Sequence, residues 1–168
     1  MIEVKSVKID GENVHLFNSA IYIFQSSTGN TLELDMIVSE VVVNKYRNEE
    51  NLIVEIELQD GRVINTYMHV KSLTGGLPQL NLFSELEDSD DYQDFYRVHE
   101  NDLSFPSIEE GITIEEIRQY EMPDEKITLK LNLPIAQTEW LKQYKNKELT
   151  GILKEAIYDY WSKNNIKK

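Results

Sequence analysis

Apolar and polar residues alternate over short stretches through the first hundred residues, a period of two that is typical of β-strands with one buried face. Turn signals separate these stretches, the clearest being Asp10-Gly11 and the polar run at residues 25–30. Residues 38–43 are predicted to continue extended, and residues 44–51 to form a polar loop. The most regular alternation sets three apolar residues against three polar ones: Leu32, Leu34 and Met36 against Thr31, Glu33 and Asp35.

The best-specified hairpin covers residues 52–70, and its register follows from the positions of its aliphatic residues. A two-residue turn at Asp60-Gly61 would scatter these residues over both faces of the sheet. A three-residue loop at residues 59–61, with Gly61 in the left-handed conformation of a bulge, gathers them on one face. This loop sets four pairs opposite each other: Leu58 and Arg62, Ile56 and Ile64, Val54 and Thr66, Leu52 and Met68.

Shorter signals follow between residues 71 and 124. Residues 80–83 and 95–98 are predicted strands, and the acidic stretch at residues 85–94 separates them. Thr113 and Glu116 have the spacing of a capping box, which predicts a short helix to about residue 120. Residues 122–124, which include a Pro, are the predicted hinge to the rest of the chain.

Three signals follow one another after residue 125. Apolar residues at 127, 129, 131 and 133 alternate with polar ones, which predicts a half-buried strand. Pro134 ends this strand and opens a short helix to about residue 144. A longer helix is predicted from Lys147 to about Asn164, because its apolar residues keep helical spacing. This stripe contains seven residues: Leu149, Ile152, Leu153, Ala156, Ile157, Tyr160 and Trp161.

This order of strand, short helix and longer helix resembles the ribbon-helix-helix family of methionine repressor and Arc type. The resemblance covers residues 126–163 and rests on Leu-Asn-Leu-Pro at residues 131–134, on Leu141 and on residues 150–157. In that family two chains pair their strands into an antiparallel ribbon, which enters the major groove and reads base edges with its polar face. The resemblance therefore implies a homodimer that binds DNA.

By position, the resemblance assigns base reading to Thr128, Lys130 and Asn132, with Lys126 at the start of the same polar face. It also implies that the first turn of the second helix holds a DNA phosphate with its backbone N–H groups. The sequence departs from the family pattern at residues 148 and 149, where Glu and Leu replace a small hydroxyl residue and a basic residue. Residues 135 and 136, Ile and Ala, also replace polar residues.

A second interpretation of the same stretch stays open at this point. The strand at residues 126–133 would join the sheet of its own chain, and the two helices would cover that sheet within a single domain. Both interpretations predict the α+β class. They share an acidic, antiparallel β-rich N-terminal region at residues 1–120 and a basic strand-helix-helix segment at residues 125–168.

Charge is distributed unevenly between these two regions. The chain of 168 residues carries a formal charge of −13, yet residues 125–168 hold nine Lys against five acidic residues, a net +4. Residues 1–124 therefore carry −17. Such asymmetry indicates that one region meets a polyanion while the other does not, although two regions of opposite charge also attract each other.

Candidate catalytic and metal-binding patterns are sparse. The chain has no Cys, which excludes disulfides and thiolate metal sites. The acidic stretch lacks the Gly and the Glu that an EF-hand loop requires, and His15, His69 and His99 fall on separate predicted strands. The sequence contains no Gly-rich phosphate loop and no nucleophile elbow. We therefore expect no enzyme activity, no metal site and no cofactor.

Two functions fit these patterns. The first is a dimeric DNA-binding regulator of transcription, in which the segment at residues 126–163 is joined to an acidic β-domain. The second is an acidic protein-binding module, such as an inhibitor, an immunity protein or a phage or plasmid accessory protein, that docks on a basic partner. The charged N-terminus and the lack of about eighteen consecutive apolar residues predict a cytoplasmic protein that does not enter a membrane.

Overall fold

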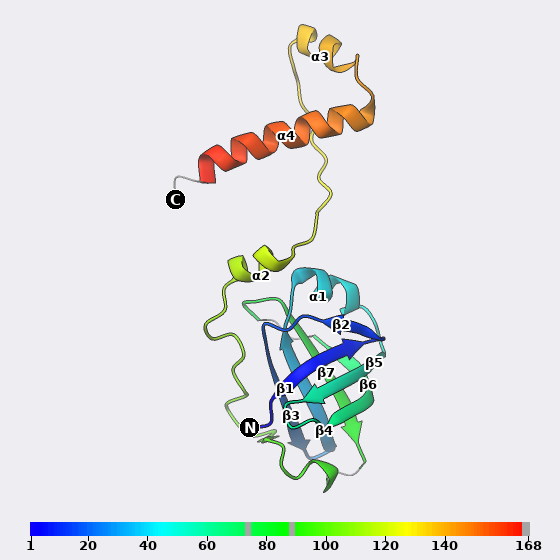
Figure 1. Cartoon of the computed structure of the whole chain (residues 1–168), viewed down its shortest axis with the longest axis vertical. Helices are drawn as coiled ribbons and strands as arrows, with labels where there is room; N and C mark the ends of the chain where they lie inside the picture. Colours follow the sequence, from blue (N-terminus) through cyan, green and yellow to red (C-terminus); the bar gives the residue numbers. More distant parts are fainter. Residues whose placement is uncertain (73–74, 88–89, 166–168) are drawn as a thin grey trace. The chain divides into compact units, whose positions relative to one another are not determined.

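The structure is a computed structural model that describes residues 1–72, 75–87 and 90–165. The chain divides into two compact units, Met1–Asp124 and Glu125–Lys168, which are described separately (Figure 1). Strands and helices both form, which confirms the α+β class. The described elements of the first unit are β1 (Val4–Ile9), β2 (Glu12–Val14), β3 (Asn18–Ser26), β4 (Gly29–Ile37), α1 (Glu40–Tyr46), β5 (Leu52–Leu58), β6 (Val63–Lys71), β7 (Gln79–Leu86), η1 (Asp90–Tyr92), β8 (Arg97–His99) and α2 (Ile114–Tyr120).

A single sheet of eight strands contains β1 to β8, in the order β2-β1-β5-β6-β7-β4-β3-β8. Neighbouring strands in this sheet pair antiparallel except β3 and β8, which are parallel. The predicted antiparallel, β-rich region is therefore present, and the pair of β3 and β8 is its parallel exception. No hairpin joins β8 to β3, so the chain returns to the sheet along a long connection that permits the parallel direction.

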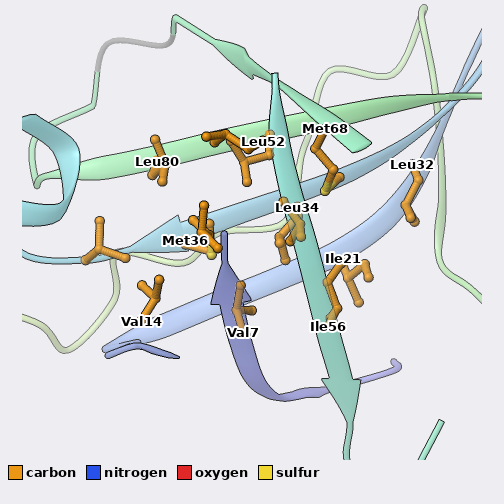
Figure 2. Close-up of a cluster of buried hydrophobic side chains, with 14 of the residues drawn as sticks. Val7, Val14, Ile21, Leu32, Leu34, Met36, Leu52, Ile56, Met68 and Leu80 are labelled. Atoms are coloured by element: carbon orange, nitrogen blue, oxygen red, sulfur yellow. The ribbon is translucent and has the colours of Figure 1, made fainter. Parts of the chain in front are cut away.

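The sheet curves so that its two halves face each other across the main core. Figure 2 shows β5 crossing the direction of β3, β4 and β7, with buried side chains filling the space between the two layers. Ile21, Leu34, Met36 and Ile56 all have 0% exposed surface. Because these side chains alternate along their strands, the period-two pattern of the sequence becomes the inner face of the sheet.

The hairpin of β5 and β6 has the predicted register. The structure pairs the same residues: Leu52 with Met68, Val54 with Thr66 and Ile56 with Ile64. Across the three-residue loop, the Leu58 N–H donates to the Arg62 carbonyl, and Gly61 has a φ of +90°. The bulged loop is therefore confirmed. The turn at Asp10-Gly11 is confirmed as well, since it joins β1 to β2 with positive φ at both residues.

Replacing Gly61 with Val is expected to destabilise the first unit by about 1 kcal/mol or more, because a β-branched residue is strained at positive φ. Among the described residues, nothing beyond its chain neighbours lies within 4 Å of a Cβ built at this position, so the cost comes from the backbone. Gly61→Asn is the matched control, since Asn tolerates the left-handed region. Urea unfolding of both variants checks this prediction, and a Val curve that coincides with wild type would contradict it.

Residues 40–46 form helix α1, so the prediction of an extended segment at residues 38–43 is wrong. Ser39 is the N-cap, and its Oγ accepts from the Val42 N–H at 3.2 Å. The same hydroxyl donates to the Glu121 carboxylate. Tyr46, only 5% exposed, packs the end of the helix into the main core. The cap and this packing outweigh the β propensity of the three consecutive Val residues.

Helix α2 begins with the predicted capping box. Thr113 accepts from the Glu116 N–H, while the Glu116 side chain accepts from the Thr113 N–H. Ile117 is fully buried in a second apolar cluster with side chains of β3 and β4. The strand predicted at residues 80–83 is part of the longer β7, and the one predicted at 95–98 corresponds to the short β8. Residues 88–89 of the acidic stretch lie outside the described residues.

The second unit contains two described helices, α3 (Ile135–Leu141) and α4 (Asn146–Asn165). Both were predicted, although α3 ends about one turn earlier than expected. Residues 126–133 carry no strand and do not belong to the eight-stranded sheet, so the strand predicted there does not form within the single chain. The described strands therefore give no support to the interpretation that joins them to that sheet. In the described part of the chain, no helix has both the length and the apolar character needed to cross a membrane.

Candidate nucleic-acid interface

The apolar residues of the segment at 126–133 are exposed in the single chain. Ile127, Leu129 and Leu131 expose between 66% and 69% of their surface, and Leu133 exposes 39%. The described chain therefore does not form the buried face that the alternation predicts for these residues. Burial of apolar surface is favourable by about 25 cal/mol per Å². This row of aliphatic side chains is therefore a surface that a partner would stabilise.

The predicted DNA-reading residues lie between these apolar positions. Lys126, Thr128, Lys130 and Asn132 are all exposed, and in an extended backbone they share one face. No hydrogen bond or ion pair within the described ranges engages their side chains. Their polar groups are therefore exposed, and the grouping of the four on one face stays a prediction from the alternation.

Helix α4 carries a second exposed apolar surface. Leu153, Ile157 and Trp161 expose 48%, 56% and 59% of their surface, and Tyr160 exposes 75%. Together with Ala156 they border an open groove of about 470 Å³. The stripe has the helical spacing of a face that packs against another element, yet the described residues of this unit leave it uncovered.

The first turn of α4 already holds a carboxylate. Glu148 Oε2 accepts from the Lys145 N–H at 2.9 Å, which satisfies one of the amide groups at the start of the helix. The family resemblance implies a DNA phosphate at this turn. A phosphate would meet the negative charge of Glu148 there, so we expect this contact to contribute less than in the family pattern.

The first unit contains a cavity with polar residues in its floor, which the sequence patterns did not predict. Glu33 and Asp35, which alternation assigns to the solvated face of a strand, are only 3% and 7% exposed. The Tyr22 hydroxyl donates to Asp35 Oδ2 at 3.0 Å, and Asn81 Nδ2 donates to Asp35 Oδ1 at 2.7 Å. Burial, together with the Asp35 charge, raises the pKa of Tyr22. Local alternation carries no signal for this site, because residues 105–109 line it from far along the chain.

Metal-binding geometry is missing from the described part of the chain, where no three His, Asp or Glu side chains are arranged to hold an ion. His15 and His69 lie against aromatic rings. The His15 ring stacks on Tyr120 with centroids 4.0 Å apart, and the His69 ring lies 5.4 Å from Phe83. His99 belongs to β8, at the edge of the sheet.

Comparison with known proteins returns no match: no protein-family model, curated protein or solved structure is similar enough to this chain to be matched to it. The proposals below therefore rest on the residues and geometry of the chain itself.

Proposed function

We propose that this protein is a non-enzymatic, dimeric DNA-binding regulator of ribbon-helix-helix type with an acidic β-domain. The observation that supports this proposal best is the pair of regular apolar surfaces in the second unit, along residues 127–133 and along α4, both exposed in the single chain. One extended segment and two helices are too few elements to enclose a core of their own. The unit therefore requires a partner.

The proposed partner is a second copy of the chain. Two segments at residues 126–133, running antiparallel, would satisfy each other's backbone N–H and C=O groups and gather their apolar side chains on a common face. The two α4 stripes would then cover that face. A twofold interface uses the same surface on both subunits, so one chain supplies each half of the core. The residues that such a core would bury are Ile127, Leu129, Leu131, Leu133, Leu153, Ile157 and Trp161.

The opposite face of this ribbon would present Thr128, Lys130 and Asn132 from both chains, with Lys126 near its ends. Hydroxyl, ammonium and amide groups are the types that contact base edges in the major groove. The net charge of +4 on residues 125–168 favours contact with a polyanion. The charge of −17 on residues 1–124 would keep DNA away from the acidic β-domain and so confine binding to the ribbon.

Lys130→Ala is expected to weaken DNA binding by about 1–3 kcal/mol without dissociating the dimer, since it removes a base contact from the exposed face. Because the operator is unidentified, the probe is a duplex enriched from a random pool by the wild-type chain. Anisotropy titrations of the full chain at several salt concentrations measure the loss. Lys163→Ala removes the same charge from the last turn of α4 and is the matched control, with a smaller expected effect.

Failure of the wild-type chain to enrich any duplex at low salt would contradict the DNA-binding proposal. A result in which Lys163→Ala and Lys130→Ala weaken binding equally would leave the protein DNA-binding but remove Lys130 from the reading face.

The concentration of negative charge in residues 1–124 favours a second candidate function, docking of an acidic module on a basic protein. As an inhibitor, immunity protein or accessory protein, such a module would use the acidic region and would not require the ribbon. Chromatography on immobilised heparin at low salt separates the two candidates. The DNA-binding regulator is retained, whereas a purely acidic module is repelled and flows through.

A further inference from the structure

The first unit contains a cavity of about 410 Å³ over the face of the sheet that points away from the main core. Its floor is a row of polar residues on three neighbouring strands. Asp35 on β4 pairs with Asn81 on β7, and Asn81 pairs with Lys71 on β6. Directly paired residues carry their side chains on the same face, so these three stand side by side. The volume falls in the range of sites for small molecules.

Residues 105–109 border the cavity and are fastened to the opposite rim. The Glu109 carboxylate accepts from the Gly76 N–H at 3.0 Å, from the Leu77 N–H at 3.1 Å and from Gln79 Nε2 at 2.6 Å. These donors, the Leu77 N–H foremost, lower the pKa of Glu109. Three hydrogen bonds to one carboxylate hold this rim in place and give the cavity a defined shape.

An aromatic side chain forms part of the same border. The Phe105 ring lies 6.3 Å from the Tyr22 ring and 6.1 Å from the Phe24 ring, and it is 51% exposed. Asn18 Nδ2 donates to the Ile108 carbonyl at 2.9 Å, which holds the segment close to β3. The cavity therefore combines a polar floor with an aromatic wall that reaches the surface.

Asp35 and Lys71 are the charged groups of the floor, and Asp35 is only 7% exposed. Within the described residues no ion pair includes it, because Lys71 pairs instead with Glu33 at 3.4 Å. An ionised carboxylate offers about four acceptor positions, and Tyr22 and Asn81 occupy two of them. A buried carboxylate without a cation is costly, so a positively charged ligand would be stabilised here.

Two side-chain amides of the lining add acceptors, whereas Lys71, the cation of the floor, is paired with Glu33 at 3.4 Å. A carboxylate only accepts, so Asn81 must turn its NH₂ group to Asp35, and Gln79 must turn its NH₂ group to Glu109. Both amides therefore have their oxygen atoms left to accept from a ligand. An anionic ligand would be repelled by the two carboxylates, and a neutral apolar ligand would leave Asp35 without a cation.

We infer that this cavity binds a small organic cation, in which a primary ammonium or a guanidinium group is attached to an apolar or aromatic body. The cationic group would donate to Asp35 and to the amide oxygens of Asn81 and Gln79, and the body would lie against Phe105. This inference goes beyond the proposed DNA binding and does not depend on it, since the lining residues all belong to the unit Met1–Asp124.

Two probes with the same body and different head groups test the inference: 2-phenylethylammonium and 2-phenylethanol. In ¹⁵N-resolved NMR titrations of the full chain, the ammonium is expected to cause saturable shifts at the lining residues and to bind about tenfold more tightly than the alcohol, or better. Equal affinity for both probes, no saturable binding of the ammonium, or shifts confined to other surfaces would overturn the inference.

Asp35→Asn keeps the shape of the floor and removes its charge, so it is expected to reduce ammonium affinity by about tenfold or more and to leave the alcohol unchanged. Tyr22 and Asn81 both donate to Asp35, and the variant could fail to fold for that reason. Phe105→Ala leaves these buried bonds in place and should weaken both probes. Tyr67→Ala, at an exposed aromatic position on β6 outside the cavity, is the control. Unchanged ammonium affinity in a folded Phe105→Ala variant would also overturn the inference.

Discussion

Replacing Leu34 with Ala is expected to lower the free energy of unfolding of the first unit by about 3–5 kcal/mol. Leu34 is 0% exposed at the centre of the main core. Its register partners, Ile21 on β3 and Leu82 on β7, are also fully buried, and strand pairing holds both in place. The surrounding structure therefore has little freedom to close the space that the lost side chain leaves, and the cost of a cavity adds to the lost burial.

Ile53→Ala is the matched control for this prediction. It removes a side chain of the same size from β5, where Ile53 is 57% exposed. The free energy of unfolding is expected to fall by less than about 1 kcal/mol. Equilibrium unfolding in urea measures both effects, provided that the dependence of the free energy of unfolding on urea concentration is the same in both variants. Equal shifts of the two midpoints would mean that the inner face of the curved sheet has been assigned wrongly.

The hairpin of β5 and β6 shows which parts of this fold the sequence specifies locally. Its register depends on Gly61 and on aliphatic residues within a few positions of the loop, so the whole signal lies in one stretch. Helix α1 shows the opposite case. Three consecutive Val residues favour a strand, and the decisive contacts are a cap at Ser39 and the packing of Tyr46 into a distant core. The cap residue is a weaker local signal than the run of β-branched residues that follows it.

The cavity could not be predicted for a related reason. Glu33 and Asp35 alternate with buried aliphatic residues and therefore match the pattern of a solvated strand face. Asp35 lines the cavity with residues 105–109 and accepts from Asn81 of β7, and Glu33 pairs with Lys71 of β6; all of these partners are distant in sequence. Alternation predicts which residues share a face, but it does not predict which segment will cover that face.

The second unit contains one part that the local sequence specifies and one part that depends on a distant partner. Its helices were predicted to within a few residues, because Pro134 and the apolar spacing of α4 are local signals. The segment at residues 126–133 has the alternation of a strand but pairs with none of the described strands, and a strand forms only when another strand satisfies its backbone groups. The local pattern therefore predicts an apolar face, and the missing partner becomes a prediction about assembly.

At micromolar concentration the full chain is expected to sediment as a dimer, and the Leu131→Asp variant as a monomer. Leu131 is 68% exposed in the single chain and belongs to the apolar face that the proposed ribbon would bury. In the dimer its twofold copy lies in the same small core, so the substitution would place two carboxylates in an apolar site. Each unpaired buried charge costs several kcal/mol, which corresponds to a dissociation constant raised by about a hundredfold or more.

Asn132→Asp is the matched control for this experiment, because it adds the same charge one residue further along, on the opposite face of the segment. This variant is expected to remain a dimer and to bind DNA more weakly, since the new carboxylate would face the phosphates and base edges. Sedimentation velocity over a range of protein concentrations distinguishes the variants, and circular dichroism checks that the sheet and helices remain folded. A wild-type chain that is folded and monomeric, or two variants that both remain dimeric, would contradict a ribbon paired through residues 126–133.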